Sequence, residues 1–190
     1  MIFGMEWNVF LAEVLGIAVG IFAITAMQMK NMTLILIFQL TSNLLVAVTY
    51  ALKGEMSGAS ICFLAVAQTL AVYFLQKNNK KIPYLMTAIF VALYIACSAW
   101  TYVKPIDLIS ATAAICYALG VAQSKPSVCR LFFLANGVLW TTFDIMTHAA
   151  YTVMFTHAFL TVSAIVGVIR LDRDDWKAFF GRIFGRAKKS

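Results

Sequence analysis

The sequence predicts an all-α membrane protein with seven transmembrane helices, and three observations support that fold class. Hydrophobic residues make up 62% of the 190 residues and charged residues only 12%, whereas a soluble domain is nearer half apolar and a quarter charged. The apolar residues form long stretches separated by very short polar connections, and the basic residues are confined to those connections and the C-terminal tail. A soluble fold of this length is excluded, because it could not keep so much apolar surface from water.

The predicted spans approach the roughly 20 residues that are needed to cross about 30 Å of hydrocarbon. Because the connections between them are short, consecutive spans must be antiparallel neighbours. The three prolines, Pro83, Pro105 and Pro126, stand at or just before predicted helix starts, where a missing N–H costs little. The predicted spans cover residues 9–27, 32–52, 56–75, 83–103, 106–121, 128–146 and 149–169.

The distribution of basic residues predicts the orientation of the chain. All but Lys53 and Lys104 of the 15 lysines and arginines fall in the tail and in the connections that share its side of the membrane. Cytoplasmic loops carry the excess of lysine and arginine, so the N-terminus is predicted outside the cytoplasm and the C-terminus inside. The net charge of +7 therefore sets orientation and does not indicate binding to nucleic acid.

Two triplets of spans around a single linker span predict a parallel repeat, one of the symmetric plans found in transporters. Gln28 ends the first span and Gln123 ends the fifth. Asn43 and Asn136 occupy matched places in the second and sixth spans, each six residues before a threonine. The predicted parts are a first three-helix repeat over residues 1–76, a linker helix over 77–103, a second repeat over 104–170 and a cytoplasmic tail over 171–190.

Several of these residues carry a resemblance to known families. The stretch from Leu134 to Trp140 is similar to the "N..LW" signature of the SWEET and PQ-loop membrane proteins, which are built as three helices, a linker and three helices. Over nearly its whole length the chain resembles the YgjV family of bacterial inner-membrane proteins, through Gly58-Ala59-Ser60, the segment 104–107 and the helix from Asn136 to Trp140. The resemblance implies a multi-pass protein of the bacterial inner membrane.

Polar side chains at mid-depth are the candidate site residues. Asn43, Gln68, Asn136 and His157 lie about 12 to 18 Å into their spans. An amide without a hydrogen-bond partner at that depth costs roughly several kcal/mol of stability, so these side chains must face the bundle. They either form hydrogen bonds that hold helices together or, with Trp140, bind a small polar solute.

Two carboxylates are predicted within about 6 Å of the outer membrane edge, Glu13 and Asp144. Each could reach outward to water. Alternatively, they form an outer gate or proton-linked site with His148, which is about one helical turn from Asp144. The four cysteines fall in apolar stretches without metal-ligand spacing, so neither a metal site nor a cofactor is expected.

The tail, residues 171–190, predicts an amphipathic helix lying on the anionic inner leaflet of the bilayer. Its large apolar residues recur on one helical face and its basic residues form the remainder. A solvated tail is the alternative. The residues of the apolar face are Trp176, Phe179, Phe180, Ile183 and Phe184.

Three functions remain open from the sequence. The first is a facilitator or carrier of a small polar solute, with its site between the repeats. The second is a non-transporting membrane scaffold or accessory subunit. The third, an intramembrane lipid-processing enzyme, has no nominated residues; the common catalytic and nucleotide-binding motifs are missing, so no enzyme is expected. The expected partners are the bilayer and the solute, and an oligomer is compatible with the sequence.

Overall fold

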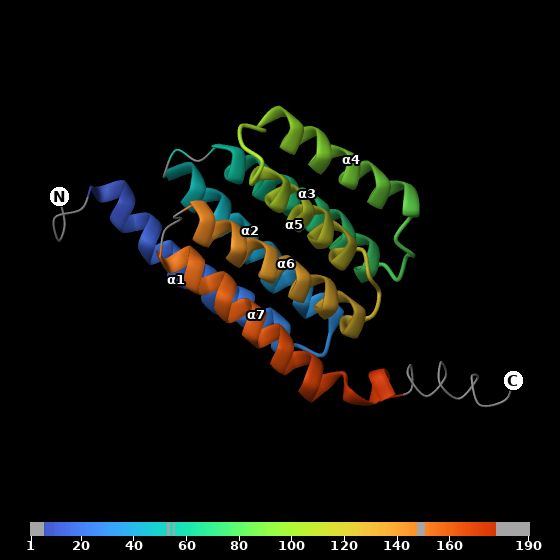
Figure 1. Ribbon diagram of the computed structural model, residues 1–190. Coiled ribbons are helices and arrows are strands. Elements are labelled where there is room, and N and C mark those ends of the chain that lie inside the picture. The colour runs from blue at the N-terminus through green and yellow to red at the C-terminus, as the bar shows by residue number, and fades with distance from the viewer. Residues whose placement is uncertain (1–5, 53, 55, 148–150, 178–190) are drawn as a thin grey trace, which may run out of the picture.

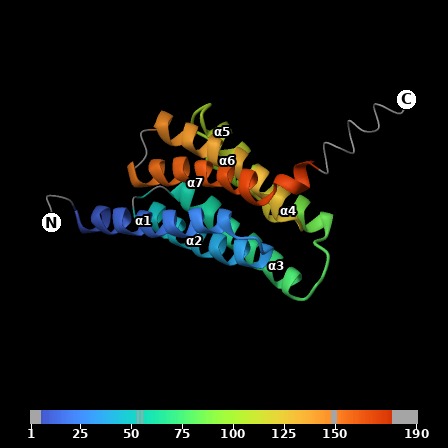
Figure 2. The same ribbon diagram turned by 90° about the horizontal axis from the view of Figure 1, so that it is seen from below.

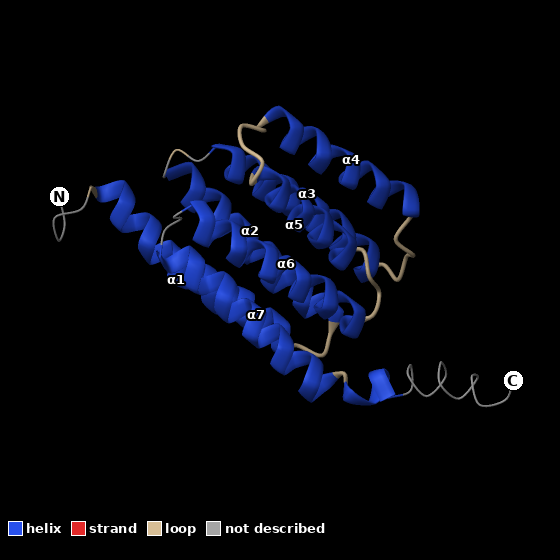
Figure 3. Ribbon diagram, viewed as in Figure 1, coloured by secondary structure: helices blue, strands red, loops and turns tan. Residues whose placement is uncertain are grey.

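The computed structural model describes residues 6–52, 54, 56–147 and 151–177. Within these ranges the chain forms helices and no strands (Figures 1 and 3). Each helix lies over one of the predicted spans, within a few residues at either end. The helices are α1 Trp7–Gln28, α2 Met32–Leu52, α3 Met56–Lys77, α4 Tyr84–Trp100, α5 Asp107–Val121, α6 Pro126–Thr147 and α7 Tyr151–Leu171.

Five of these helices are long and apolar enough to cross a membrane: α1, α2, α3, α6 and α7. Helices α4 and α5 are apolar but shorter, with 17 and 15 residues. The predicted fourth span extended to Val103, whereas α4 ends at Trp100. The chain turns there because the Asp107 carboxylate accepts hydrogen bonds of 2.8 Å from the backbone N–H groups of Val103 and Lys104.

The helices pack in two layers, α1–α2–α3 and α5–α6–α7 (Figure 2). Within each layer the middle helix packs along both of its neighbours. Between the layers, α1 packs closely along α7, whereas α3 and α5 touch less. Helix α4 lies outside the layers and contacts α3 and α5 (Figure 1). The bundle is therefore tight along one side and opened along the other, where α4 covers the gap.

Small residues and hydroxyl groups hold α1 against α7. The hydroxyl of Thr152 lies against Gly16, where a Cβ atom would come within 2.8 Å of it. Thr156 donates to the Gly16 carbonyl at 3.3 Å, and Ser163 donates to the Ile24 carbonyl at 3.0 Å. Such contacts let helix backbones approach closely where lipid gives no hydrophobic driving force between helices.

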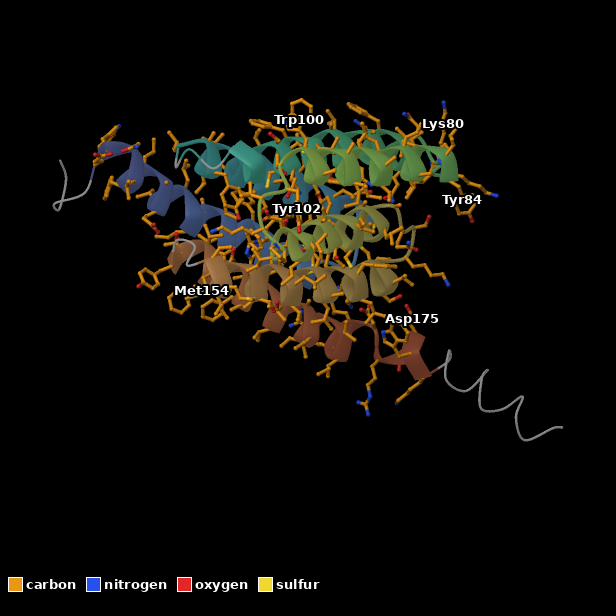
Figure 4. All side chains as sticks on the ribbon, turned by 45° about the horizontal axis from the view of Figure 1, so that its top comes forward. Lys80, Tyr84, Trp100, Tyr102, Met154 and Asp175 are labelled. Carbon is orange, nitrogen blue, oxygen red and sulfur yellow. The ribbon has the colours of Figure 1, made fainter. Side chains whose placement is uncertain are left out.

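The outward side of α4 is apolar and open. Tyr84 and Trp100 stand at its two ends (Figure 4), 95% and 92% exposed. Aromatic residues at helix ends are typical of the boundary between hydrocarbon and head groups. The exposed apolar surface is thus suited to contact with lipid, as the composition predicts.

Candidate functional site

A central cavity of about 60 Å³ lies between the two layers, and all seven helices contribute to its lining. At roughly 10 to 15 Å³ for each water molecule by this measure, it has room for about four to six waters. Its lining is largely apolar, but amide, hydroxyl, phenol and imidazole groups from five helices reach it. Those polar side chains are Gln39, Ser42, Asn43, Tyr50, Tyr94, Tyr117, Asn136, Thr156 and His157.

The cavity brings together four of the five side chains that the sequence nominated for a solute site. Asn43, Asn136, Trp140 and His157 all line it. Gln68 lies outside the lining, and its Nε2 donates to the backbone carbonyl of Ala118 at 3.0 Å, joining α3 to α5. The matched asparagines therefore share one space, whereas the glutamine links two helices.

Asn43 begins a directed chain of hydrogen bonds across the layers. Its Nδ2 donates to the Gln39 carbonyl at 2.8 Å and to the Tyr117 hydroxyl at 2.6 Å. Tyr117 also lies 2.6 Å from the Thr69 hydroxyl, which itself donates to the Ala65 carbonyl. Because Thr69 has one hydrogen, Tyr117 must be the donor between the two. The chain joins α2, α5 and α3, and Tyr117 was not nominated from the sequence.

Asn136 has a simpler environment on the other side of the cavity. Its Nδ2 donates to the backbone carbonyl of Ala113 at 2.7 Å, and its side chain is buried. This bond stays within the second layer, between α6 and α5. A carbonyl oxygen can only accept, so the bond fixes which end of the Asn136 amide is nitrogen.

Asp144 and His157 form a buried pair beside the cavity. The Asp144 Oδ2 atom lies 2.6 Å from His157 Nδ1, and Asp144 is fully buried. The ring of Trp140 stacks on His157 with centroids 5.6 Å apart. The sequence had paired Asp144 with His148, which lies outside the described residues. His157 was nominated only as a separate mid-depth residue, because its proximity to Asp144 depends on how α6 and α7 pack.

Glu13 lies apart from this pair. Its carboxylate accepts a hydrogen bond from the Thr152 hydroxyl, and so contributes to the contact between α1 and α7. Glu13 does not line the central cavity. Both predicted outer carboxylates thus face α7, but only Asp144 adjoins a cavity residue.

A second cavity of about 310 Å³ lies at the end of the bundle where α2, α4 and α6 end and α3 and α5 begin. It shares Tyr50, Ile61 and Trp140 with the central cavity. These three side chains therefore border both spaces. In the predicted orientation this second cavity is on the outer side, and we call it the vestibule.

The opposite end of the bundle is held by the Arg130 cluster, which consists of Arg130, Asp172 and the backbone carbonyls of Met27 and Met29. Arg130 is 1% exposed, and its Nη1 atom pairs with the Asp172 carboxylate at 2.5 Å. Its Nε donates to the Met27 carbonyl at 2.9 Å, and its Nη2 donates to Met29. Burial raises the pKa of the Asp172 carboxyl, and the Arg130 guanidinium opposes that shift.

This cluster was missed by the sequence reasoning. Arg130 had been counted as a cation of a cytoplasmic connection, whereas it lies inside α6 and is buried. Asp172 lies in the segment 171–190 that was predicted as the tail. The predicted apolar face of the tail helix falls mostly outside the described residues; only Trp176 lies within them, in a helical turn over residues 173–177.

The fold and its apolar surface define a class, the multi-pass α-helical membrane proteins. The chain belongs to the Imp-YgjV family, described as bacterial inner membrane protein, whose family model matches residues 10–175. The predicted YgjV resemblance and the inner-membrane location are thereby confirmed. No curated protein matches the chain. No solved structure matches it.

Proposed function

We propose that this protein is a facilitator or carrier of a small polar solute, and not an enzyme, with its binding site in the central cavity. The observation that carries the proposal is that one cavity with several polar groups is lined by all seven helices. Helix pairing alone requires hydrogen bonds between neighbours, but no space shared by the whole bundle. Transporter sites commonly lie near the bilayer midplane at the contact between repeats.

The proposal includes seven spans arranged as two parallel triplets around linker α4, as in SWEET proteins. The contacts between triplets at Gln28 and Gln123 support a two-fold relation between them. Gln28, at the end of α1, donates to the Ser163 carbonyl on α7 at 2.9 Å. Gln76, on α3, donates to the Gln123 carbonyl, which follows α5, at 3.3 Å. Exchanging the triplets would place the α1–α7 contact on the α5–α3 contact, but the hydrogen bond runs in the opposite direction, because the Gln123 side chain donates to the Leu119 carbonyl of its own helix.

The two ends of the central cavity differ, which supports alternating access. Toward the vestibule, the two spaces have Tyr50, Ile61 and Trp140 as common lining among the described residues. Toward the other end, Tyr117 and Phe133 stack with centroids 5.4 Å apart, and the Arg130 cluster lies beyond them. We propose that this arrangement is the outward-facing state, with the C-terminus in the cytoplasm and the tail on anionic lipid.

The scaffold alternative has its own supporting observation. The amides of Gln68 and Asn136 both donate to backbone carbonyls of α5, as expected for side chains that only hold helices together. The two functions predict opposite results for replacements at the cavity and away from it.

The test is uptake by purified protein in liposomes, measured against a diverse panel of small polar solutes. The variants Asn43→Leu and Asn136→Leu each replace a cavity-lining amide by an apolar side chain with the same number and branching of heavy atoms. Gln68→Leu is the matched control, because it removes a buried amide that does not line the cavity. We expect the two cavity variants to abolish uptake and the control to retain it.

The melting temperatures of the three variants distinguish a carrier from a scaffold. If the amides only hold helices, all three variants should lower the melting temperature to similar extents, and no solute should move into wild-type liposomes. Wild-type uptake that survives both asparagine replacements would contradict the cavity as the site.

A further inference from the structure

Two hydroxyl groups of the cavity lining, on Ser42 and Thr156, donate their hydrogens to the protein itself. Ser42 donates to the Val19 carbonyl at 3.3 Å, and Thr156 donates to the Gly16 carbonyl at 3.3 Å. Each hydroxyl has only one hydrogen, so its remaining capacity toward the cavity is that of an acceptor. Two lining groups on two helices thus present lone pairs.

Asn43 also offers an acceptor to the cavity, because both of its N–H donors are already used within the protein. An amide carries two N–H donors, and the structure directs one to the Gln39 carbonyl and one to the Tyr117 hydroxyl. Tyr117 in turn donates to Thr69. The unused hydrogen-bonding group of Asn43 is therefore its carbonyl oxygen, Oδ1, and the orientation of the amide is fixed by a backbone acceptor.

Asn136 and His157 extend this pattern. Asn136 is oriented by its bond to the Ala113 carbonyl, so its Oδ1 is fixed opposite that contact. A carboxylate accepts hydrogen bonds, so the neutral His157 ring carries its hydrogen on Nδ1, toward Asp144, and leaves Nε2 as an acceptor. Asp144 is thus a positioning residue, because it acts on the cavity through the tautomer of His157.

From this polarity we infer that the solute of the proposed carrier is a small hydrogen-bond donor, a molecule rich in O–H or N–H groups. Its donors would pair with Asn43 Oδ1, Asn136 Oδ1 and His157 Nε2, which come from three helices. The Tyr94 hydroxyl also lines the cavity, is buried, and has no hydrogen-bond partner among the described residues. It is a fourth group that such a solute would satisfy.

The size of the cavity and the polarity of its lining narrow the class of solute. Space for about four to six waters admits a solute of only a few heavy atoms in this state. A solute that offers only acceptors would pair at most with the lining donors, which are the Gln39 amide and the Tyr94 hydroxyl. It would leave the Oδ1 atoms of Asn43 and Asn136 and the Nε2 atom of His157 without a donor. Two chemistries share the required donors: neutral polyols or amides, and small ammonium ions, which aromatic rings such as Trp140 would also attract.

The first experiment compares donors with molecules that have none. Liposomes containing the full chain are supplied with radiolabelled glycerol, urea or methylammonium, and with tetramethylammonium or acetate as donor-free comparisons. We expect protein-dependent uptake of at least one donor solute to exceed that of both donor-free solutes by about tenfold or more, as the loss of a buried hydrogen bond implies. Uptake of glycerol or urea would show that the solute is a neutral polyol or amide, and uptake of methylammonium would show that it is a small ammonium ion.

The inference rests on the proposed function, and the outcomes separate the two. Uptake of tetramethylammonium or acetate without uptake of any donor solute would overturn the inference and leave a carrier in place. If none of these solutes moves and the wider panel also fails, the proposed function is overturned as well.

A second experiment tests the polarity of the cavity lining, through the tautomer of His157, without measuring transport. The chain has two histidines, so His148→Gln leaves His157 as the sole histidine for ¹⁵N labelling. In bilayer nanodiscs we expect the neutral ring to carry its hydrogen on Nδ1, and Asp144→Leu to shift the population toward the Nε2–H form. A wild-type ring with its hydrogen on Nε2 would place a donor at the cavity and overturn the inference.

Discussion

Replacing Arg130 by methionine tests whether the Arg130 cluster holds the end of the bundle opposite the vestibule. Arg130 is 1% exposed, pairs with Asp172 and donates to two backbone carbonyls at the end of α1. Removing one partner of a buried ion pair costs roughly 3 to 5 kcal/mol. Asp172 lies just beyond the end of α7, at an end of the bundle and not in its middle, so we expect the lower end of this range, about 3 kcal/mol. For a chain of this size that corresponds to a melting temperature lower by about 6 to 12 °C.

The assay is thermal unfolding in detergent with a thiol-reactive dye, which reports exposure of the buried cysteines Cys62 and Cys129. The matched control is Arg173→Met, which removes the same charge from an exposed position beside Asp172. Surface replacements usually change stability by less than about 0.5 kcal/mol, so the control should melt within about 2 °C of wild type. Arg130→Met and Asp172→Asn should also combine to less than the sum of their separate effects. If Arg130→Met has the same melting temperature as the Arg173→Met control, the cluster does not stabilise the bundle.

Three further predictions address topology, packing and the tail. A cysteine introduced at Lys104 should react with a membrane-impermeant reagent in intact cells, whereas one at Lys30 should react only after permeabilisation; the reverse pattern would contradict the orientation. Gly167→Ala should lower the melting temperature, because the new Cβ would lie 2.7 Å from the Met27 carbonyl oxygen and overpacking costs roughly 1 to 3 kcal/mol; an unchanged melt would show that α7 can shift freely. Deleting residues 178–190 should leave the melt unchanged and weaken binding to anionic vesicles in a salt-sensitive way, as measured by co-sedimentation; equal binding with and without these residues would rule out a lipid-bound tail.

The candidate site was partly predictable from the sequence, because a polar residue in the middle of an apolar span has few acceptable environments. That reasoning found Asn43, Asn136, Trp140 and His157, which line one cavity. It assigned no role to Tyr94 or Tyr117, since aromatic residues are common in membrane spans and carry no positional signal by themselves. It also could not tell Gln68, which bonds to Ala118 outside the cavity, from the others.

Pairing between helices could not be read from the sequence. Asp144 and His148 are close along the chain, but the structure places His157 against Asp144, from the next helix. Which face of α7 meets α6 depends on the rotation of both helices, and many residues jointly set that rotation. The same holds for Arg130, whose partners on α1 and after α7 are far from it in sequence.

What the sequence alone determined is the membrane class, the positions of the helices and the family, because these follow from local composition. An apolar stretch of sufficient length has to satisfy its backbone as a helix in lipid, whatever its neighbours are. The tertiary structure decided the tight α1–α7 side, the gap covered by α4, the shared cavity and the buried Arg130. These features depend on contacts between distant segments, where a few small residues such as Gly16 and a few directed hydrogen bonds select one packing among many with similar apolar burial.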